Sequence, residues 1–284
     1  MIKIDRGRFL SIVEANKIRE KEVTFSGQVY SFYQNIGLPF GSQIADVIQS
    51  VNLLLKENHF KVIELPLKDK EISAFYYDGD KQKKYIILNS SLSVGNNNFA
   101  LLHEVYHVLY RNKESIREAE SYLLSYELNE EEACANTFAG VILLPEAPFK
   151  AIYKKVVELY GDIMQGMNLY CLVLTQLMSY FKATYMSVLI RCFELELIQE
   201  NDENTIDFLL SWGTEENIKK ICKVLLLNES FLKHTKKNDF INLMDNIDSE
   251  LKDAIEKDLV SQEDVELIKQ QIKSYYDKII DVEE

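Results

Sequence analysis

The sequence has few proline and glycine residues. Only 4 prolines and 10 glycines occur in 284 residues, while 47% of the residues are hydrophobic. Because proline and glycine interrupt regular structure, their scarcity beside so many hydrophobic residues indicates a globular chain rich in helix. The length is sufficient for one large domain or two modest ones, each with a real core.

The chain also lacks an excess of basic charge. Its 32 lysines and arginines are outnumbered by 45 aspartates and glutamates, which gives a formal net charge of −13. A nucleic-acid surface needs a basic face to meet the phosphates, so we expect no direct contact with nucleic acid. An acidic chain remains compatible with a basic protein partner.

Membrane and secretion signals are missing as well. No apolar run approaches the length of a transmembrane helix, and residues 1–6 do not begin a signal-peptide core. The four cysteines have no C-x-x-C spacing and lie in helical patterns, so we expect them to be reduced and packed. These absences predict a cytoplasmic protein without membrane contact, acting on an intracellular substrate.

An H-E-x-x-H pentad, residues 103–107, lies within an apolar helical pattern. Residues four apart share one face of a helix, so His103 and His107 can direct two imidazoles at one point, as a zinc ion requires. Glu104 lies one step round the helix, where a carboxylate can take a proton from a water held on the metal. The alternative is a half-buried helix whose histidines bond to backbone or water. We expect this helix to be capped by one of the asparagines 96–98.

A second pattern follows at residues 131–145. Small and apolar residues at Ala135, Ala139 and Leu143 predict a helix that packs closely on another, ended by the prolines at 145 and 148. Glu132 shares the face of these small residues, where a carboxylate is costly unless a charged or hydrogen-bonding group meets it. A metal bound by two histidines would provide the charge that the Glu132 carboxylate needs. The alternative is a solvated charge within the acidic run 130–132.

Together the two patterns resemble the ImmA/IrrE metallopeptidases, a group of gluzincin-type zinc proteases. The matching elements are H-E-x-x-H and then E-x-x-A-N-x-F-A with L-L-P, and the resemblance covers roughly residues 36–150, extending more faintly to 198. It implies Zn²⁺ held by His103, His107 and Glu132, with Glu104 as the catalytic base. Asn136 would orient a histidine ring. The pentad departs from the family at Val105 and Tyr106, where small residues are common; the departure leaves the expected metal ligands intact and concerns the shape of the cleft alone.

We predict an α+β fold that is mostly α. A helix capped by Ser42 precedes three strands, at 60–67, 72–77 and 85–88, which form a small antiparallel sheet ahead of the metal helices. We expect four units along the chain: an N-terminal helical segment at 1–35, a zinc metallopeptidase domain at 36–198, a linker at 199–204, and a C-terminal helical domain at 205–284 for partner recognition or self-association.

Two further segments have simple interpretations. The charged residues 112–130 are expected to form a helix and loop on the rim of the cleft. The helices at 169–181 and 185–198 are joined like a helix-turn-helix, but Arg191 is the only basic residue of the second helix. We therefore interpret the pair as packing and not as a DNA reader.

The leading hypothesis is a zinc-dependent endopeptidase. Relatives cleave a partner repressor of the helix-turn-helix type in stress, prophage or mobile-element regulation, and the resemblance implies such a DNA-binding protein as substrate. The first alternative is a non-proteolytic anti-repressor or scaffold, with zinc purely structural. The second is a transcription factor using residues 182–198, which the acidic charge balance disfavours.

Overall fold

The computed structural model describes residues 4–78, 84–110, 130–198 and 203–281. The expected rim segment at 112–130 lies outside the described residues except for its last position, and so does most of the expected linker at 199–204. In chain order the elements are α1 (Arg6–Glu20), α2 (Val23–Asn35), α3 (Val47–Glu57), β1 (Phe60–Leu65), β2 (Ala74–Asp78), β3 (Lys84–Asn89), α4 (Val94–Tyr110), α5 (Glu130–Leu143), α6 (Glu146–Tyr160), α7 (Met167–Phe181), α8 (Tyr185–Glu194), α9 (Glu203–Trp212), α10 (Glu215–Leu225), η1 (Glu229–Leu232), α11 (Phe240–Glu256) and α12 (Gln262–Ile279).

The predicted fold class, mostly α with one small sheet, is confirmed, but the sheet is mixed and not purely antiparallel. Its strand order is β1-β3-β2, with β3 parallel to β1 and antiparallel to β2. A parallel pair needs a crossover connection, and here the chain crosses between β1 and β2. Asn89 at the end of β3 holds that crossover: its side chain accepts from Leu67 N and donates to the carbonyls of Asp69 and Ile72.

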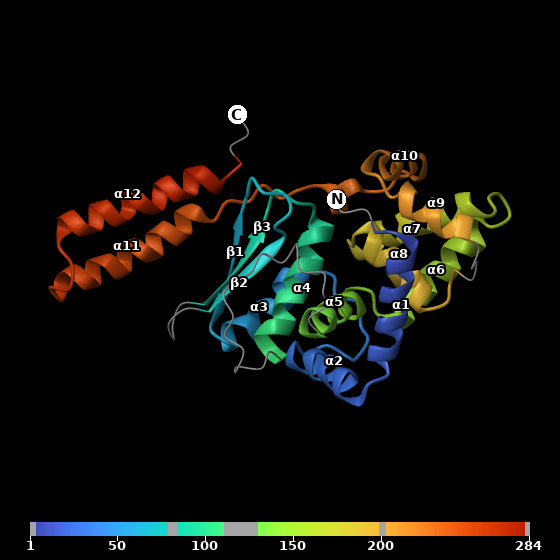
Figure 1. Cartoon of the computed structure of the whole chain (residues 1–284), viewed down its shortest axis with the longest axis horizontal. Helices are drawn as coiled ribbons and strands as arrows, with labels where there is room; N and C mark the ends of the chain where they lie inside the picture. Colours follow the sequence, from blue (N-terminus) through green and yellow to red (C-terminus); the bar gives the residue numbers. More distant parts are fainter. Residues whose placement is uncertain (1–3, 79–83, 111–129, 199–202, 282–284) are drawn as a thin grey trace.

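The helices α4 and α5, which carry the predicted metal ligands, lie at the centre of the larger body, next to the sheet (Figure 1). Ala135 and Ala139 of α5 are fully buried, so the small residues do allow the close helix packing that the sequence predicted. One continuous cluster of buried side chains runs from Phe9 in α1 to Phe231 in η1. This cluster draws on all three predicted units, and the division into those units stays a prediction.

Several helix boundaries differ from the prediction. α3 begins at Val47, with the Asp46 carboxylate accepting from Gln49 N, because Asp46 and not Ser42 reaches an unpaired N–H. The asparagines 96–98 lie inside α4, whose first turn is held by Ser93 Oγ accepting from Asn96 N. Pro148 lies in the first turn of α6, where its missing N–H costs nothing.

The pair α7 and α8 packs in the core. Arg191 of α8 is 2% exposed and is bonded to Glu20, Glu194 and the carbonyl of Leu144. Its guanidinium is therefore unavailable to a phosphate group, which agrees with the interpretation of this pair as packing.

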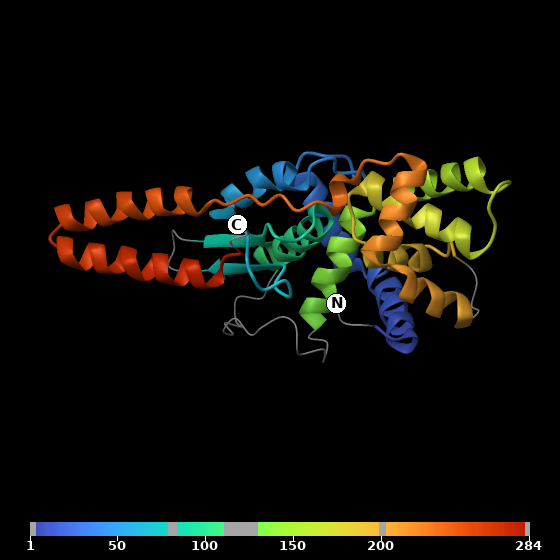
Figure 2. The ribbon, with the colours of Figure 1, turned by 90° about the horizontal axis from the view of Figure 1, so that it is seen from above.

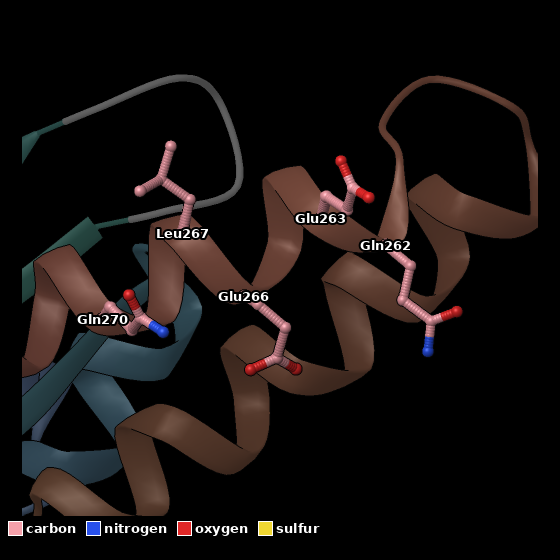
Figure 3. A pocket seen from close by; sticks show the side chains of 5 residues that line it. All are labelled: Gln262, Glu263, Glu266, Leu267 and Gln270. Atoms are coloured by element: carbon pink, nitrogen blue, oxygen red, sulfur yellow. The ribbon is translucent and has the colours of Figure 1, made fainter.

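The helices α11 and α12 form a hairpin that extends away from the rest of the molecule in both views (Figures 1 and 2). It is anchored at its base, where Leu67 bridges Ile280 and a small apolar cluster forms with Ile63 and Leu65. An open hollow on α12 is lined by Gln262, Glu263, Glu266, Leu267 and Gln270 (Figure 3). Across the described part of the chain, no helix is both long and apolar enough to cross a membrane.

Candidate metal centre

Two packed helices bring the predicted ligands together. His103, Glu104 and His107 come from α4, and Glu132 and Asn136 come from α5. The rings of Tyr106 and Phe138 pack across the two helices, with centroids 5.4 Å apart. This apolar contact holds the two helices together beside the polar side chains.

The donor atoms of three side chains converge on one point. Glu132 Oε2 lies 3.1 Å from His103 Nε2, and Glu132 Oε1 lies 3.2 Å from His107 Nε2. The two Nε2 atoms are 3.2 Å apart. All three ligand atoms fall within 4.8 Å of one another, and among the residues that the structure describes they form the one group of histidines, cysteines and acids able to hold a metal.

The other nitrogen of each ring is already engaged. His103 Nδ1 lies 3.0 Å from Asn136 Oδ1, and His107 Nδ1 lies 2.9 Å from Glu131 Oε1. Both partners accept hydrogen bonds, so in the tautomer with the proton on Nδ1 each Nε2 has its lone pair free for a metal. Two imidazole nitrogens and one carboxylate are the donor set of many catalytic zinc sites, so the residues present fit zinc.

The electrostatics of the centre favour a positive charge at this point. Burial opposes the charged form of Glu132, yet its hydrogen bonds with His103 and His107 outweigh burial and lower the pKa of the Glu132 carboxyl to about 2. Burial likewise acts to lower the pKa of His107, but Glu132, Glu104 and Glu131 raise it overall. The carboxylates of Glu132, Glu104 and Glu131 thus favour a positive charge on His107. A metal cation bound at this point would supply that positive charge in place of the proton.

Glu104 is the least satisfied polar group of the centre. It is 3% exposed, and its Oε2 atom has no hydrogen-bond partner among the described residues. Burial raises the pKa of the Glu104 carboxyl, and the neighbouring His103 and His107 act in the opposite direction. A buried polar atom without a partner is costly, and such atoms concentrate at sites that receive a ligand or a water.

The sheet borders the centre through β2. Tyr76 of β2 stacks on the His107 ring, with centroids 6.0 Å apart and ring planes 25° apart. β2 lies at one edge of the sheet formed by the described strands, and this edge strand therefore lies next to the predicted metal ligands.

Sequence reasoning missed Glu131 and Tyr76. Glu131 belongs to the acidic run that had been weighed as a solvated face, and only its position directly before Glu132 hints at a role. The other two histidines of the chain lie outside the centre: His59 lies at the junction of α3 and β1, and His234 is exposed beside Ser93.

Residues 56–193 match a family of known proteins described as the IrrE N-terminal-like domain, Peptidase_M78. The matched segment begins at the end of α3 and ends in α8, and so contains the sheet and both metal helices. Searches of curated proteins and of solved structures returned no significant match.

Proposed function

We propose, starting from the fact that the chain belongs to the ImmA/IrrE family of peptidases, that it is a zinc-dependent endopeptidase. One observation supports this most: two histidines and a glutamate from two helices bring their donor atoms within 4.8 Å, beside a buried glutamate with an unpartnered oxygen. Structural zinc sites are usually closed by four protein ligands and rich in cysteine, whereas three ligands of this kind are typical of catalytic sites.

His103, His107 and Glu132 would hold the zinc, and Asn136 and Glu131 would hold the two imidazoles in the orientation that binding requires. Bound zinc supplies a Lewis acid that makes a water more acidic and polarises a peptide carbonyl. This division of roles explains why both Nδ1 atoms are bonded to acceptors while both Nε2 atoms face Glu132.

Glu104 would move the proton. We assign the step to Oε2, the atom without a partner. The carboxylate takes a proton from the attacking water as the new C–O bond forms, and it returns the proton to the amine as the C–N bond breaks. Burial raises the pKa of Glu104, which makes the carboxylate a better base than an exposed glutamate.

The edge of β2 that pairs with no other described strand would receive the substrate backbone. An extended peptide can pair with an exposed strand edge through main-chain hydrogen bonds. Tyr76 places this edge against His107, so a peptide paired there would pass the metal ligands. Side chains around the centre would then set the selectivity.

The substrate class is a DNA-binding repressor of the helix-turn-helix type, as the family resemblance implies. Such proteins carry basic surfaces, and the net charge of −13 on this chain would attract them. The competing function is a non-proteolytic anti-repressor that binds the same target.

The test incubates the purified protein with helix-turn-helix repressors encoded in the same genome and follows each repressor by mass spectrometry. We expect one defined cut that a chelator prevents and added zinc restores. Glu104→Gln should retain zinc yet cut at least a hundredfold more slowly, since general-base catalysis contributes about 10²–10⁴-fold. Glu158→Gln, at an exposed position on α6, is the matched control and should cut normally.

Cleavage that survives Glu104→Gln would refute the assigned mechanism. Binding of the repressor without any cleavage, by the unaltered protein loaded with zinc, would favour the anti-repressor.

A further inference from the structure

We propose that Arg19 on α1 is a positioning residue for the metal centre. It holds α5 against the rest of the molecule so that Glu131, Glu132 and Asn136 face α4 in the correct register. The inference rests on the proposed zinc site, and it assigns a role in that site to the N-terminal segment, which lies outside the family match at residues 56–193.

The Arg19 guanidinium contacts α5 at two places. Its Nε and Nη2 donate to Glu130 Oε1 at 3.3 and 3.0 Å, and its Nη1 donates to Thr137 Oγ1 at 2.9 Å. Arg19 and Thr137 are 6% and 2% exposed. The planar guanidinium presents several donors in a rigid fork, so these contacts fix both the height and the rotation of α5.

The two contacts lie on either side of the proposed ligand along the length of α5. Glu130 and Thr137 are seven residues apart, which is about 10 Å along a helix. Glu131, Glu132 and Asn136 all lie between them in sequence. A shift of α5 by a fraction of a turn would carry all three away from the histidines at once.

Glu20, the next residue of α1, is connected to the C-terminal end of α5. Glu20 pairs with Arg191, and Arg191 Nε donates to the carbonyl of Leu144 at 3.0 Å, directly after α5 ends. One turn of α1 is thereby connected to both ends of α5. Of the two connections, the one through Arg19 contacts Glu130, which directly precedes Glu131 and the proposed ligand Glu132.

The contact contributes more to geometry than to stability. The Glu130 side chain is 76% exposed, and ion pairs of that kind contribute little to stability. The hydroxyl of Thr137 is buried, so its bond to Arg19 has one defined geometry. Loss of Arg19 should therefore affect metal binding more than it affects folding.

The experiment measures the zinc dissociation constant by competition with a chromophoric chelator, and the unfolding midpoint of the metal-free protein. The variants are Arg19→Ala and Arg19→Lys. Thr137→Val removes the buried acceptor and serves as a second test if Arg19→Ala does not fold. The control is Arg6→Ala, because Arg6 also lies on α1 and pairs with two acids, Glu203 and Asp207, but does not contact α5.

We expect Arg19→Ala to raise the zinc dissociation constant about tenfold, the lower end of the range seen when groups that support metal ligands are removed. Arg19→Lys should give a smaller increase, because one ammonium cannot reach both acceptors. Arg6→Ala should stay within twofold of the unaltered protein, even where its unfolding midpoint falls as far as that of Arg19→Ala.

A zinc dissociation constant within twofold of the unaltered protein in Arg19→Ala or Thr137→Val would overturn the inference, provided that His103→Ala abolishes binding. An equal loss in Arg6→Ala would also overturn it, because the effect would then follow from a general loosening of α1. Failure of the unaltered protein to bind zinc would instead overturn the proposed function, and the inference with it.

Discussion

Removal of the Glu131 carboxylate should weaken zinc binding although Glu131 is not a metal ligand. Its Oε1 lies 2.9 Å from His107 Nδ1, and the His107 side chain is only 2% exposed. Without this acceptor the Nδ1 proton has no partner, and the ring can move its proton to Nε2. A protonated Nε2 cannot bind a metal, so part of the binding energy goes to restoring the correct tautomer.

The structure sets the expected size and order of the effect. Loss of a group that orients a metal-bound histidine typically costs 10–100-fold in affinity, or about 1.4–2.7 kcal/mol. Glu131→Ala removes the acceptor and should show this loss. Glu131→Gln keeps a carbonyl acceptor but loses the charge, and because hydrogen bonds to charged groups are about twice as strong as neutral ones, it should lose less.

The assay is chelator competition at neutral pH, with Glu158→Ala as the exposed control. The unfolding midpoint of each metal-free variant, followed by circular dichroism, shows that the fold is retained. An affinity for Glu131→Ala within twofold of the unaltered protein would refute the reasoning. So would a Glu131→Gln variant that loses more affinity than Glu131→Ala.

Three other predictions concern stability and are checked by urea unfolding. Zinc at 100 times its dissociation constant should raise the free energy of unfolding by about 2.7 kcal/mol; an equal rise in His103→Ala would contradict binding at this centre. Arg191→Ala should lower the free energy of unfolding by about 3–5 kcal/mol, because buried Glu194 loses the cation that pairs with it and keeps only its neutral bond from Asn16, and a loss below about 1 kcal/mol would contradict that account. Gly213→Ala should cost about 1–3 kcal/mol, because the new Cβ would lie 2.2 Å from Tyr185 Cδ1; an unchanged midpoint would show that Tyr185 moves aside freely.

The parts of the site that are local in sequence could be predicted. His103 and His107 share a helix face because they are four residues apart, and that relation depends on nothing beyond the helix itself. Glu132 was predicted from the small residues around it, which indicated close packing before any partner was known. The strands were located to within two residues for the same reason, because alternation is a local pattern.

The pairing of the strands could not be predicted in this way. The parallel pair of β1 and β3 depends on a crossover in which the buried side chain of Asn89 bonds the backbone groups of three residues, Leu67, Asp69 and Ile72. Nothing in the composition of the strands distinguishes this arrangement from a simple meander. The Asp46 cap was missed for a related reason, since Ser42 and Asp46 are both acceptable caps and only the packing of α3 selects between them.

Buried polar groups indicate most clearly where the function of this fold lies. A buried charge or amide is costly, and apolar residues of similar volume often stabilise a core as well or better. In the described part of the chain several such groups lie on or against α4 and α5: Glu104, His107 and Thr137 lie on these helices, and Arg19 and Arg191 hold α5 from outside, while Glu64 and Asn89 are buried in the sheet. The hairpin of α11 and α12, by contrast, keeps most of its charges exposed. Buried polar groups on α4 and α5, and on the side chains that contact α5, lower the stability of the fold. A preorganised metal centre requires such groups to be held in place in advance.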